Sequence, residues 1–315
     1  MDRIIGQYGG AHPGPLVIAI GGLHGNEPAG VQALTEIFQM LEQEVVVRPD
    51  FEFRGKLVGL VGHLQAFQRG LRFINEDLNR IWLPGKVEKI LAENSQDLRD
   101  EPLEIRELYT DICQAIQTAL PTTLVLLDLH TTSADGGIFC IPGDETDGVA
   151  LYRDLYAPVI LGLFKGLHGT LLRFATEGGF VAQGDFPLRT FGAAFEAGQH
   201  DDPLSVSRSV AAIVHALRVL DCIDESALDS RHHDDVLRQS GEHLPQVTRL
   251  EYVHPIAPED HFKMRPGYNN FQPVQQGEIL ADDTNGPVVS PSDGLILMPL
   301  YQPKGTDGFF IVREV

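Results

Sequence analysis

A histidine and a glutamate three residues apart are the first pair in this chain whose types and spacing suit metal chemistry. His24 and Glu27 lie in the segment GGLHGNEPAG, between an apolar run and the start of a predicted helix. In a tight, glycine-dense turn both side chains can reach one ion, and the positive end of the helix dipole favours the ionised form of Glu27. Taken alone, the pair also fits a solvated turn at a helix start.

A second imidazole follows the distant apolar run TLVLLDLH, which ends in His130. Two histidines and one glutamate form a known catalytic zinc set, in which the fourth position is left to water. Asp128 shares the face of His130 by the two-residue period of a strand, so it could orient the imidazole or serve as a structural carboxylate. His130 alone also fits a hydrogen-bonded residue at a strand end. We predict one Zn²⁺ per chain, held by His24, Glu27 and His130.

The elements that must position these residues alternate along the chain. Short apolar runs predict buried strands, whereas apolar residues at helical spacing predict amphipathic helices. This alternation predicts an α/β fold with a mostly parallel central sheet flanked by helices, whose ligand sites lie beyond the carboxyl ends of the strands. The strands are expected at 15–22, 51–62 and 123–130, and the helices at 28–41, 100–118 and 203–219.

The texture of the sequence changes in its last third, which predicts a division into domains. We expect a hydrolase α/β domain over 1–223, a polar linker or excursion over 224–246, and a small β-rich domain over 247–315, where short β-type segments alternate with Gly and Pro. A lipoyl or biotinyl carrier barrel is disfavoured, because Lys263 precedes the predicted barrel and Lys304 follows it. The last region is therefore expected to be structural and to overhang the mouth of the site.

Composition excludes several classes of partner. Hydrophobic residues make up 43% and charged residues 22% of the 315 positions, as in a globular protein, and the formal net charge is −20. Such a charge repels nucleic acid and anionic membrane surfaces, so neither is an expected partner. Three cysteines without a CxxC pair, and the lack of an export signal or a long apolar run, favour the cytoplasm. An assembly of identical chains is left open.

Four sequence blocks occur in an order that is specific to one family. They are GGLHGNEPAG, then RFINEDLNR at 72–80, then LLDLHTT at 126–132, then FEAG at 195–198. Together they resemble the aspartoacylase and succinylglutamate desuccinylase family, which is related to the zinc carboxypeptidases. The resemblance spans about residues 15 to 200, and the β-rich end of the chain resembles the family's C-terminal domain more loosely.

The resemblance implies a role for each matching position. It implies zinc ligation by the three residues named above, catalysis by Glu196 and Arg72, and substrate binding by Asn79 and Arg80. A carboxylate beside an activated water can take its proton, and guanidiniums can bind a carboxylate or steady an oxyanion. Without the family, Glu196 fits a surface carboxylate at a strand end, and DLNR fits a helix-capping turn stabilised by Asp77.

This chain also departs from the family pattern. Further arginine and tyrosine positions of the family have no clean counterpart, and Arg173, Arg189 and Tyr301 are only candidates for them. His63 stands where relatives tend to have Asn. The metal chemistry is therefore better determined than the identity of the substrate.

The predicted reaction is hydrolysis of the amide of a small anionic N-acyl amino acid, which releases a carboxylate and a free amino acid. Against a net charge of −20, the two arginines Arg72 and Arg80 are expected to attract that anion. One alternative is a zinc carboxypeptidase, which needs an extended cleft for peptides. Another is a non-catalytic homologue that retains a metal or ligand pocket.

Overall fold

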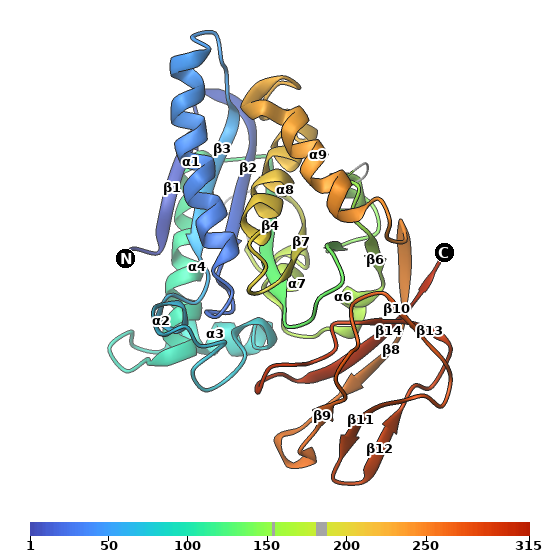
Figure 1. Cartoon of the computed structure of the whole chain (residues 1–315). Helices are drawn as coiled ribbons and strands as arrows, with labels where there is room; N and C mark the ends of the chain where they lie inside the picture. The colour runs from blue at the N-terminus through green and yellow to red at the C-terminus, as the bar shows by residue number, and fades with distance from the viewer. Residues whose placement is uncertain (153–154, 181–187) are drawn as a thin grey trace.

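The computed structural model describes residues 1–152, 155–180 and 188–315, in which one mixed sheet runs through the whole molecule (Figure 1). In spatial order its strands are β1 (Ile4–Gly9), β3 (Arg54–Val61), β2 (His12–Gly21), β4 (Thr123–Thr132), β7 (Arg189–Gln199), β5 (Phe139–Pro142), β6 (Val159–Leu161), β8 (Val247–Pro255), β14 (Asp307–Glu314), β13 (Gly294–Leu297) and β10 (Gln272–Val274). A second, small sheet near the C-terminus contains β12 (Gly286–Val289), β11 (Ile279–Asp283) and β9 (Lys263–Met264).

Helices lie on both faces of the large sheet. The α-helices are α1 (Ala29–Val47), α2 (Leu64–Arg69), α3 (Pro84–Ala92), α4 (Asp100–Ala119), α5 (Asp147–Leu151), α6 (Leu163–Gly166), α7 (Leu171–Thr176), α8 (Ser205–Val219) and α9 (Ser230–Gly241). Short 3₁₀ turns are η1 (Leu78–Arg80), η2 (Ala227–Asp229) and η3 (Pro258–Asp260). No helix among the described residues is long and apolar enough to span a bilayer.

The α/β class is confirmed, but the prediction that the sheet is mostly parallel is not. Parallel pairing joins β3, β2, β4 and β7 at the centre and continues from β5 through β6 to β8. Antiparallel pairing joins β1 to β3 and β5 to β7. It also joins β8 to β14, β14 to β13 and β13 to β10. The C-terminal strands β8, β14, β13 and β10 therefore extend the same sheet by antiparallel pairing.

The alternation of side chains along the central strands explains why both faces are covered. In β2, Ile18 and Ile20 belong to one core cluster, whereas Val17 and Ala19 belong to another on the opposite face. Helix α4 packs on the first face, and α1 and α8 pack on the second. A strand that is buried on both sides requires a continuous apolar run, which is the pattern seen in the sequence.

Residues 224–246, expected to form a linker or an excursion, contain η2 and helix α9. Helix α9 packs against α8, and its Leu237 is buried in the second core cluster. This segment contains few apolar residues, so the sequence shows no clear helical period there. Because β8 pairs with β6, the strands β8, β14, β13 and β10 continue the large sheet, whereas β9, β11 and β12 form the small one. A separate domain at 247–315 stays a prediction.

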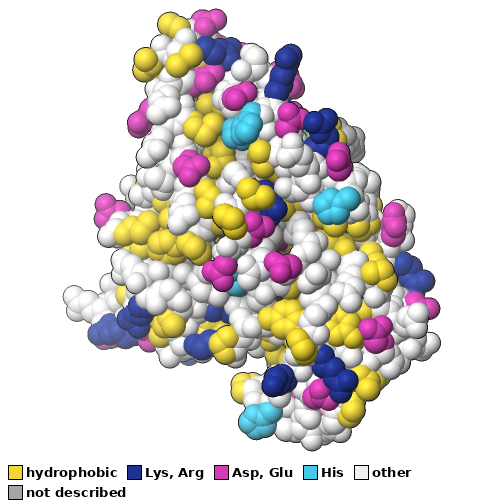
Figure 2. Space-filling view, viewed as in Figure 1, with side chains coloured by type: hydrophobic (Ala, Val, Ile, Leu, Met, Phe, Trp, Pro, Cys, Tyr) yellow, Lys and Arg dark blue, Asp and Glu magenta, His cyan; other side chains and the backbone are white. Residues whose placement is uncertain are grey.

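The C-terminal strands meet the α/β body where hydrophobic side chains gather on the surface. Figure 2 shows this junction above the small sheet, with charged side chains of both signs dispersed over the same face. The connection from β13 to β14 reaches back from here, and Met298, Leu300 and Gln302 in it line the cavity described below.

Candidate metal centre

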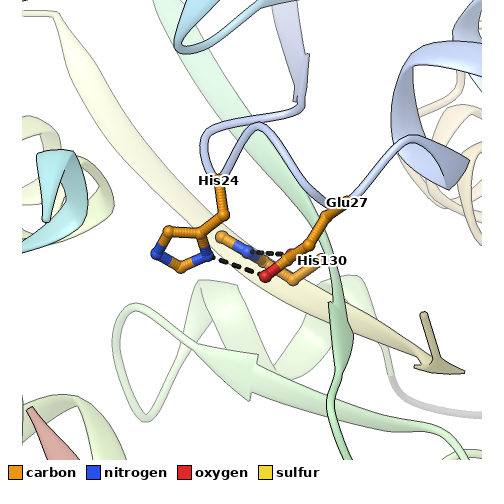
Figure 3. A group of neighbouring side chains, drawn as sticks. All are labelled: His24, Glu27 and His130. Atoms are coloured by element: carbon orange, nitrogen blue, oxygen red, sulfur yellow. Dashed lines mark hydrogen bonds and ion pairs between the residues drawn. The ribbon is translucent and has the colours of Figure 1, made fainter. Parts of the chain in front are cut away.

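Two neighbouring parallel strands bring the predicted ligands together. His24 and Glu27 lie in the loop that follows β2, and His130 lies near the carboxyl end of β4. Figure 3 shows the three side chains pointing toward one another from these elements. One ligand atom from each lies within 4.8 Å of the other two, and all three residues are buried. The predicted cluster is therefore present, with donors that suit a cation.

Glycines let the ligand loop pack closely enough to make this cluster. A Cβ at Gly25 would lie 2.2 Å from the backbone of Ala66, and a Cβ at Gly30 would lie 2.8 Å from the Cβ of Leu129. Both distances are too short for carbon atoms in contact. The loop can therefore approach α2 and β4 only where side chains are missing.

Glu27 is the centre of the hydrogen-bond network. Its Oε1 lies 2.9 Å from Nδ1 of His24, and its Oε2 lies 2.9 Å from Nδ1 of His130. The backbone N–H of Thr131 donates to Oε2, and Nη1 of Arg72 lies 3.3 Å from Oε1. Both carboxylate oxygens are thus held in place by groups from three segments of the chain.

A second carboxylate stands behind each imidazole. Nε2 of His24 lies 3.1 Å from Oδ1 of Asp77, and Nε2 of His130 lies 2.9 Å from Oδ2 of Asp128. When each Nε2 carries a proton and donates it to its carboxylate, each Nδ1 presents a lone pair to Glu27. Lone pairs on the two Nδ1 atoms then face the lone pairs of the Glu27 carboxylate and repel them. Either a proton on each Nδ1 or a cation shared by the three residues removes this repulsion. The residues present therefore fit a divalent metal.

The sequence had suggested the orienting role of Asp128 but not that of Asp77. Asp77 does cap η1, as expected, through the backbone N–H of Asn79, which lies 2.9 Å from Oδ1. The same oxygen contacts His24, 53 residues earlier in the chain. Only the fold could show this second contact.

Burial and charge oppose each other at the cluster. Burial alone would raise the pKa of Glu27, but the adjacent His24 and His130 hold it well below its usual range. Burial would lower the pKa of His130, but Asp128 and Glu27 raise it well above the usual value. The site is therefore built to hold negative charge on Glu27 beside positive charge, which is the distribution a bound cation would reinforce.

Glu196 lies beside the cluster, as the family resemblance implied. It is the register partner of His130 in the parallel pair β4–β7, and it lines the same cavity. Its Oε2 is buried and has no hydrogen-bond partner among the described residues. Burial, together with the charges of Glu27 and Asp128, raises the pKa of Glu196 to about 8, against the opposing effect of His130. This is a carboxyl group whose proton is poised to move.

The two arginines line the cavity, but both already have carboxylate partners. Arg72 lies 3.3 Å from Glu27 and 3.3 Å from Asp77, while its Nε has no partner among the described residues. Nη2 of Arg80 lies 2.7 Å from Oδ2 of Asp307 on β14. No pattern in the sequence pointed to Asp307, which lies 227 residues from Arg80. The positive charge that was expected to attract an anion is thus partly neutralised within the protein.

Asn79 also lines the cavity, where its amide has two structural contacts. Its Oδ1 accepts a hydrogen bond from the backbone N–H of Leu171, 3.0 Å away, and its Nδ2 lies 3.5 Å from Nε2 of His130. The side chain is therefore fixed in orientation before any substrate binds. Its role in substrate binding stays a prediction.

The remaining candidates lie outside the cavity lining. Arg173 on α7 pairs with Glu177, and Arg189 pairs with Asp147. The hydroxyl of Tyr301 bonds to the backbone of the loop between β9 and β10. His63 caps α2 and contacts a buried carboxylate of α4, so its role is structural.

Apolar side chains form a further part of the cavity lining, which we call the apolar wall. Its residues come from β5, β7, α6, α7, β14 and the adjoining loops, and most belong to or pack against the first core cluster. They are Ile141, Phe164, Leu167, Leu172, Ala194, Met298, Leu300 and Phe310. No sequence pattern predicted this apolar wall, because its members are spread from residue 141 to residue 310.

Comparison with known proteins agrees with this geometry. A family model described as the succinylglutamate desuccinylase/aspartoacylase catalytic domain matches residues 13–178. A curated relative, a probable aspartoacylase from Nostoc sp., is 31% identical over 129 residues, which cover 41% of this chain and 39% of that protein. The match therefore spans about two fifths of the length of the curated relative.

Solved structures show the same fold. A succinylglutamate desuccinylase from Chromobacterium violaceum has a TM-score of 0.62 at 17% identity, over 98% of this chain and 88% of that one. A succinylglutamate desuccinylase/aspartoacylase from Rhodobacter sphaeroides has a TM-score of 0.64 at 16% identity, over 96% and 86% of the two chains. At this identity the structures establish the fold alone, whereas the family model covers more than half of the chain. The protein belongs to the succinylglutamate desuccinylase/aspartoacylase family.

Proposed function

We propose that this protein is a zinc-dependent amidohydrolase that cleaves a small anionic N-acyl amino acid into a carboxylate and a free amino acid. One observation carries the proposal: Glu196, whose buried Oε2 has no partner in the part of the chain that the structure describes, lines the same cavity as the converging donors of His24, Glu27 and His130. A cation site and an available base in one cavity are what hydrolysis of an amide needs.

The donor set favours zinc over other common cations. Two imidazole nitrogens and one carboxylate suit a borderline-soft ion, whereas magnesium and calcium prefer oxygen ligands. His24, Glu27 and His130 would hold the ion, and Asp77 and Asp128 would fix the two rings. When bound, the ion supplies a Lewis acid that acidifies water and polarises a carbonyl oxygen.

Glu196 is positioned to move the proton that hydrolysis requires. As the register neighbour of His130, it lies beside the metal ligands, and a bound cation there would favour its ionised form. In that form Oε2 can accept a proton from the attacking water. The same group can then deliver the proton to the departing amine nitrogen. One carboxyl group thereby serves both steps, and no covalent intermediate is needed.

Arg72 and Arg80 would orient the substrate. Arg72, next to Glu27, lies where a guanidinium can steady the negative charge that develops on the carbonyl oxygen. Arg80 donates hydrogen bonds to Asp307 and to the carbonyl oxygen of Asn79. Its other N–H groups can still donate to one substrate carboxylate. Asn79, held by Leu171, lies between the two arginines in the chain and lines the same cavity.

The C-terminal strands support a small substrate over a peptide. Met298, Leu300 and Gln302 line the cavity from the β13–β14 connection, and the amide of Gln302 contacts Asn26 in the ligand loop at 3.1 Å. A loop seated there shortens the space that an extended peptide would need. We therefore favour acyl amino acids over the carboxypeptidase alternative.

Three unpaired cysteines support a reducing compartment. Cys140 and Cys222 are buried, and Cys113 is partly buried, with no disulfide among them. We propose a cytoplasmic location on this ground and on the composition of the chain.

A substrate panel tests the function directly. Purified protein loaded with zinc should hydrolyse N-acyl amino acids with kcat/KM at least about 100-fold above that for peptides with a free C-terminus. The variant Glu177→Gln, which changes an exposed carboxylate outside the cavity, serves as the matched control and should behave like the wild type. Preference for peptides would favour the carboxypeptidase, and bound zinc without turnover of any substrate would favour the non-catalytic homologue.

A further inference from the structure

The charges that line the cavity leave room for one substrate carboxylate only. Among the described lining residues the cations are Arg72 and Arg80, and each is already paired with a carboxylate of the protein. The acidic lining residues are Glu27, Asp128, Glu196 and Asp307. Even with a bound dication, the protein supplies no further positive group for a second carboxylate in this lining.

Asp307 lines the cavity and is paired with Arg80, the cation that a second substrate carboxylate would otherwise bind. Its Oδ2 lies 2.7 Å from Nη2 of Arg80 and accepts a hydrogen bond from the hydroxyl of Thr306 at 3.0 Å. The pair is largely shielded, since the side chains of Arg80 and Asp307 are 22% and 16% exposed. A substrate carboxylate near Arg80 must therefore share the guanidinium with Asp307, and a second one meets uncompensated repulsion.

The apolar wall offers the opposite environment. Ile141, Leu172 and Phe310 are nearly fully buried members of the first core cluster, and Phe164 and Met298 pack against them at the cavity surface. A charged group placed there would lose its hydration without gaining a partner. An apolar group would gain about fourfold in affinity for each methylene that it buries.

A small residue on β7 leaves space in the cavity beside the apolar wall. Ala194 and Glu196 lie on the same face of the strand, so the small side chain of Ala194 leaves a space next to the proposed base. A larger residue there would fill the part of the cavity between the reacting carboxylate and the apolar wall.

We propose that the substrate carries a single carboxylate and an apolar group on one side of the scissile amide, and that Asp307 selects against a second carboxylate. This proposal rests on the proposed function and narrows its substrate class. Asp307 acts through Arg80, so it is a specificity-determining residue that takes no part in the chemistry.

The test compares four substrates that differ in charge and in the position of the apolar group. N-acetyl-leucine and N-hexanoylglycine carry one carboxylate, and N-acetylaspartate and N-succinylglycine carry two. The wild type should hydrolyse at least one of the first pair about 10-fold more efficiently than either diacid, and the better of the two tells on which side of the amide the apolar wall lies. Diacids as the best substrates of the wild type would overturn the proposal.

The variant Asp307→Asn should raise the ratio of kcat/KM for diacids over monocarboxylates by roughly 10-fold, because the repulsion scales with substrate charge. A structural defect would lower both values and leave the ratio unchanged, which would contradict the selective role. Asp50→Asn, an exposed carboxylate outside the cavity lining, is the control and should leave the ratio as in the wild type.

A second variant keeps the proposal testable if Asp307→Asn is unstable. Ala194→Leu should lower kcat/KM for the better apolar substrate at least about 10-fold more than for N-acetylglycine, and equal losses would contradict the apolar subsite. Binding to the metal-loaded Glu196→Gln variant, measured by calorimetry, separates the two levels of the account. If no acyl amino acid is hydrolysed the function fails, whereas tighter binding of diacids than of monocarboxylates defeats this inference alone.

Discussion

The two sides of the cavity differ in how their side chains are held. On the side of β2, β4 and η1, charged groups are fixed by one another: Glu27 by two histidines, and those histidines by Asp77 and Asp128. The apolar lining residues from β5, α7 and β14 instead form the surface of the apolar core and are held by packing.

This difference separates chemistry from selectivity. Groups that are oriented before the substrate arrives cost no reorganisation during the reaction, so the charged side is the one suited to catalysis. The apolar side can change shape by substitution without breaking that network. Substitutions on the two sides should therefore give effects of different kinds and sizes.

The largest effect should follow from removing a ligand on the charged side. In His24→Ala one of the three donors is lost, so we expect loss of the bound metal and a fall in turnover of more than about 10⁴-fold, beyond the usual worth of a single acid–base group. Binding of an apolar carboxylate product should survive, because the apolar wall is untouched. Metal analysis and product titration on the same sample check both statements, and full metal occupancy in the variant would refute the ligand assignment.

A smaller loss is expected when only the proton carrier is changed. Glu196→Gln keeps the size of the side chain and should retain fold and metal, while kcat falls by on the order of 10²- to 10⁴-fold. Steady-state kinetics with metal analysis decides the matter. Near-normal turnover would assign the role of base to another carboxylate of the cavity, such as Asp128.

Changing a carboxylate that orients a metal ligand should have a smaller effect on turnover. Asp77→Asn can no longer accept from His24 as a carboxylate does, so metal affinity should drop by roughly 10- to 100-fold while turnover of the fully loaded enzyme changes less. Competition with a chelator measures the affinity. Asp283→Asn, in the small C-terminal sheet, is the matched control, and an equal loss in both variants would mean that the effect is not local.

The smallest effect concerns the support of the loop that holds both arginines. Glu101 on α4 accepts hydrogen bonds from the backbone N–H groups of Ile74 and Asn75 at 2.7 and 3.0 Å, and it contacts His63 at 3.2 Å. Glu101→Gln should lower the free energy of unfolding by about 1–3 kcal/mol and raise KM roughly 2- to 10-fold, because a charged acceptor is lost under the loop. Denaturant titration and kinetics test this. An unchanged free energy of unfolding together with an unchanged KM would mean that Glu101 does not support the loop.

The same carboxylate predicts a dependence of stability on pH. Burial would raise the pKa of Glu101, but the bonds from His63 and from the two backbone groups lower it below its ordinary value of 4.5. A lowered pKa in the folded state contributes stability above pH 4.5, which is lost as the pH falls through the folded-state value. The difference in stability between wild type and Glu101→Gln should therefore shrink below about pH 4.5, and a constant difference down to pH 3 would contradict this origin.

The sequence predicted the charged side of the cavity better than the apolar side. His24, Glu27 and His130 were predictable because each follows an apolar strand, and the carboxyl ends of adjacent parallel strands meet. The ion pair between Arg80 and Asp307 was not, because no local period links residues 227 positions apart. The residues of the apolar wall come from five elements and the loops beside them, so no window of the sequence contains their pattern.

The features of the fold that were not predicted have equally local causes. Strands β5 and β6 have only 4 and 3 residues, too few for a period to emerge. Helix α9 is mostly polar, and so resembled a linker. The pairing of β8 with β6 depends on contacts between segments almost 90 residues apart, which a strand pattern alone cannot assign.

A zinc titration tests the central claim most directly. Protein stripped by a chelator is mixed with increasing zinc, and hydrolysis of the best N-acyl amino acid is measured at each step beside the same series for His24→Ala. The account predicts that the stripped protein is inactive, that activity rises linearly and stops rising at one zinc per chain, and that the variant stays inactive throughout. Turnover by the stripped protein equal to that of the loaded protein would contradict it.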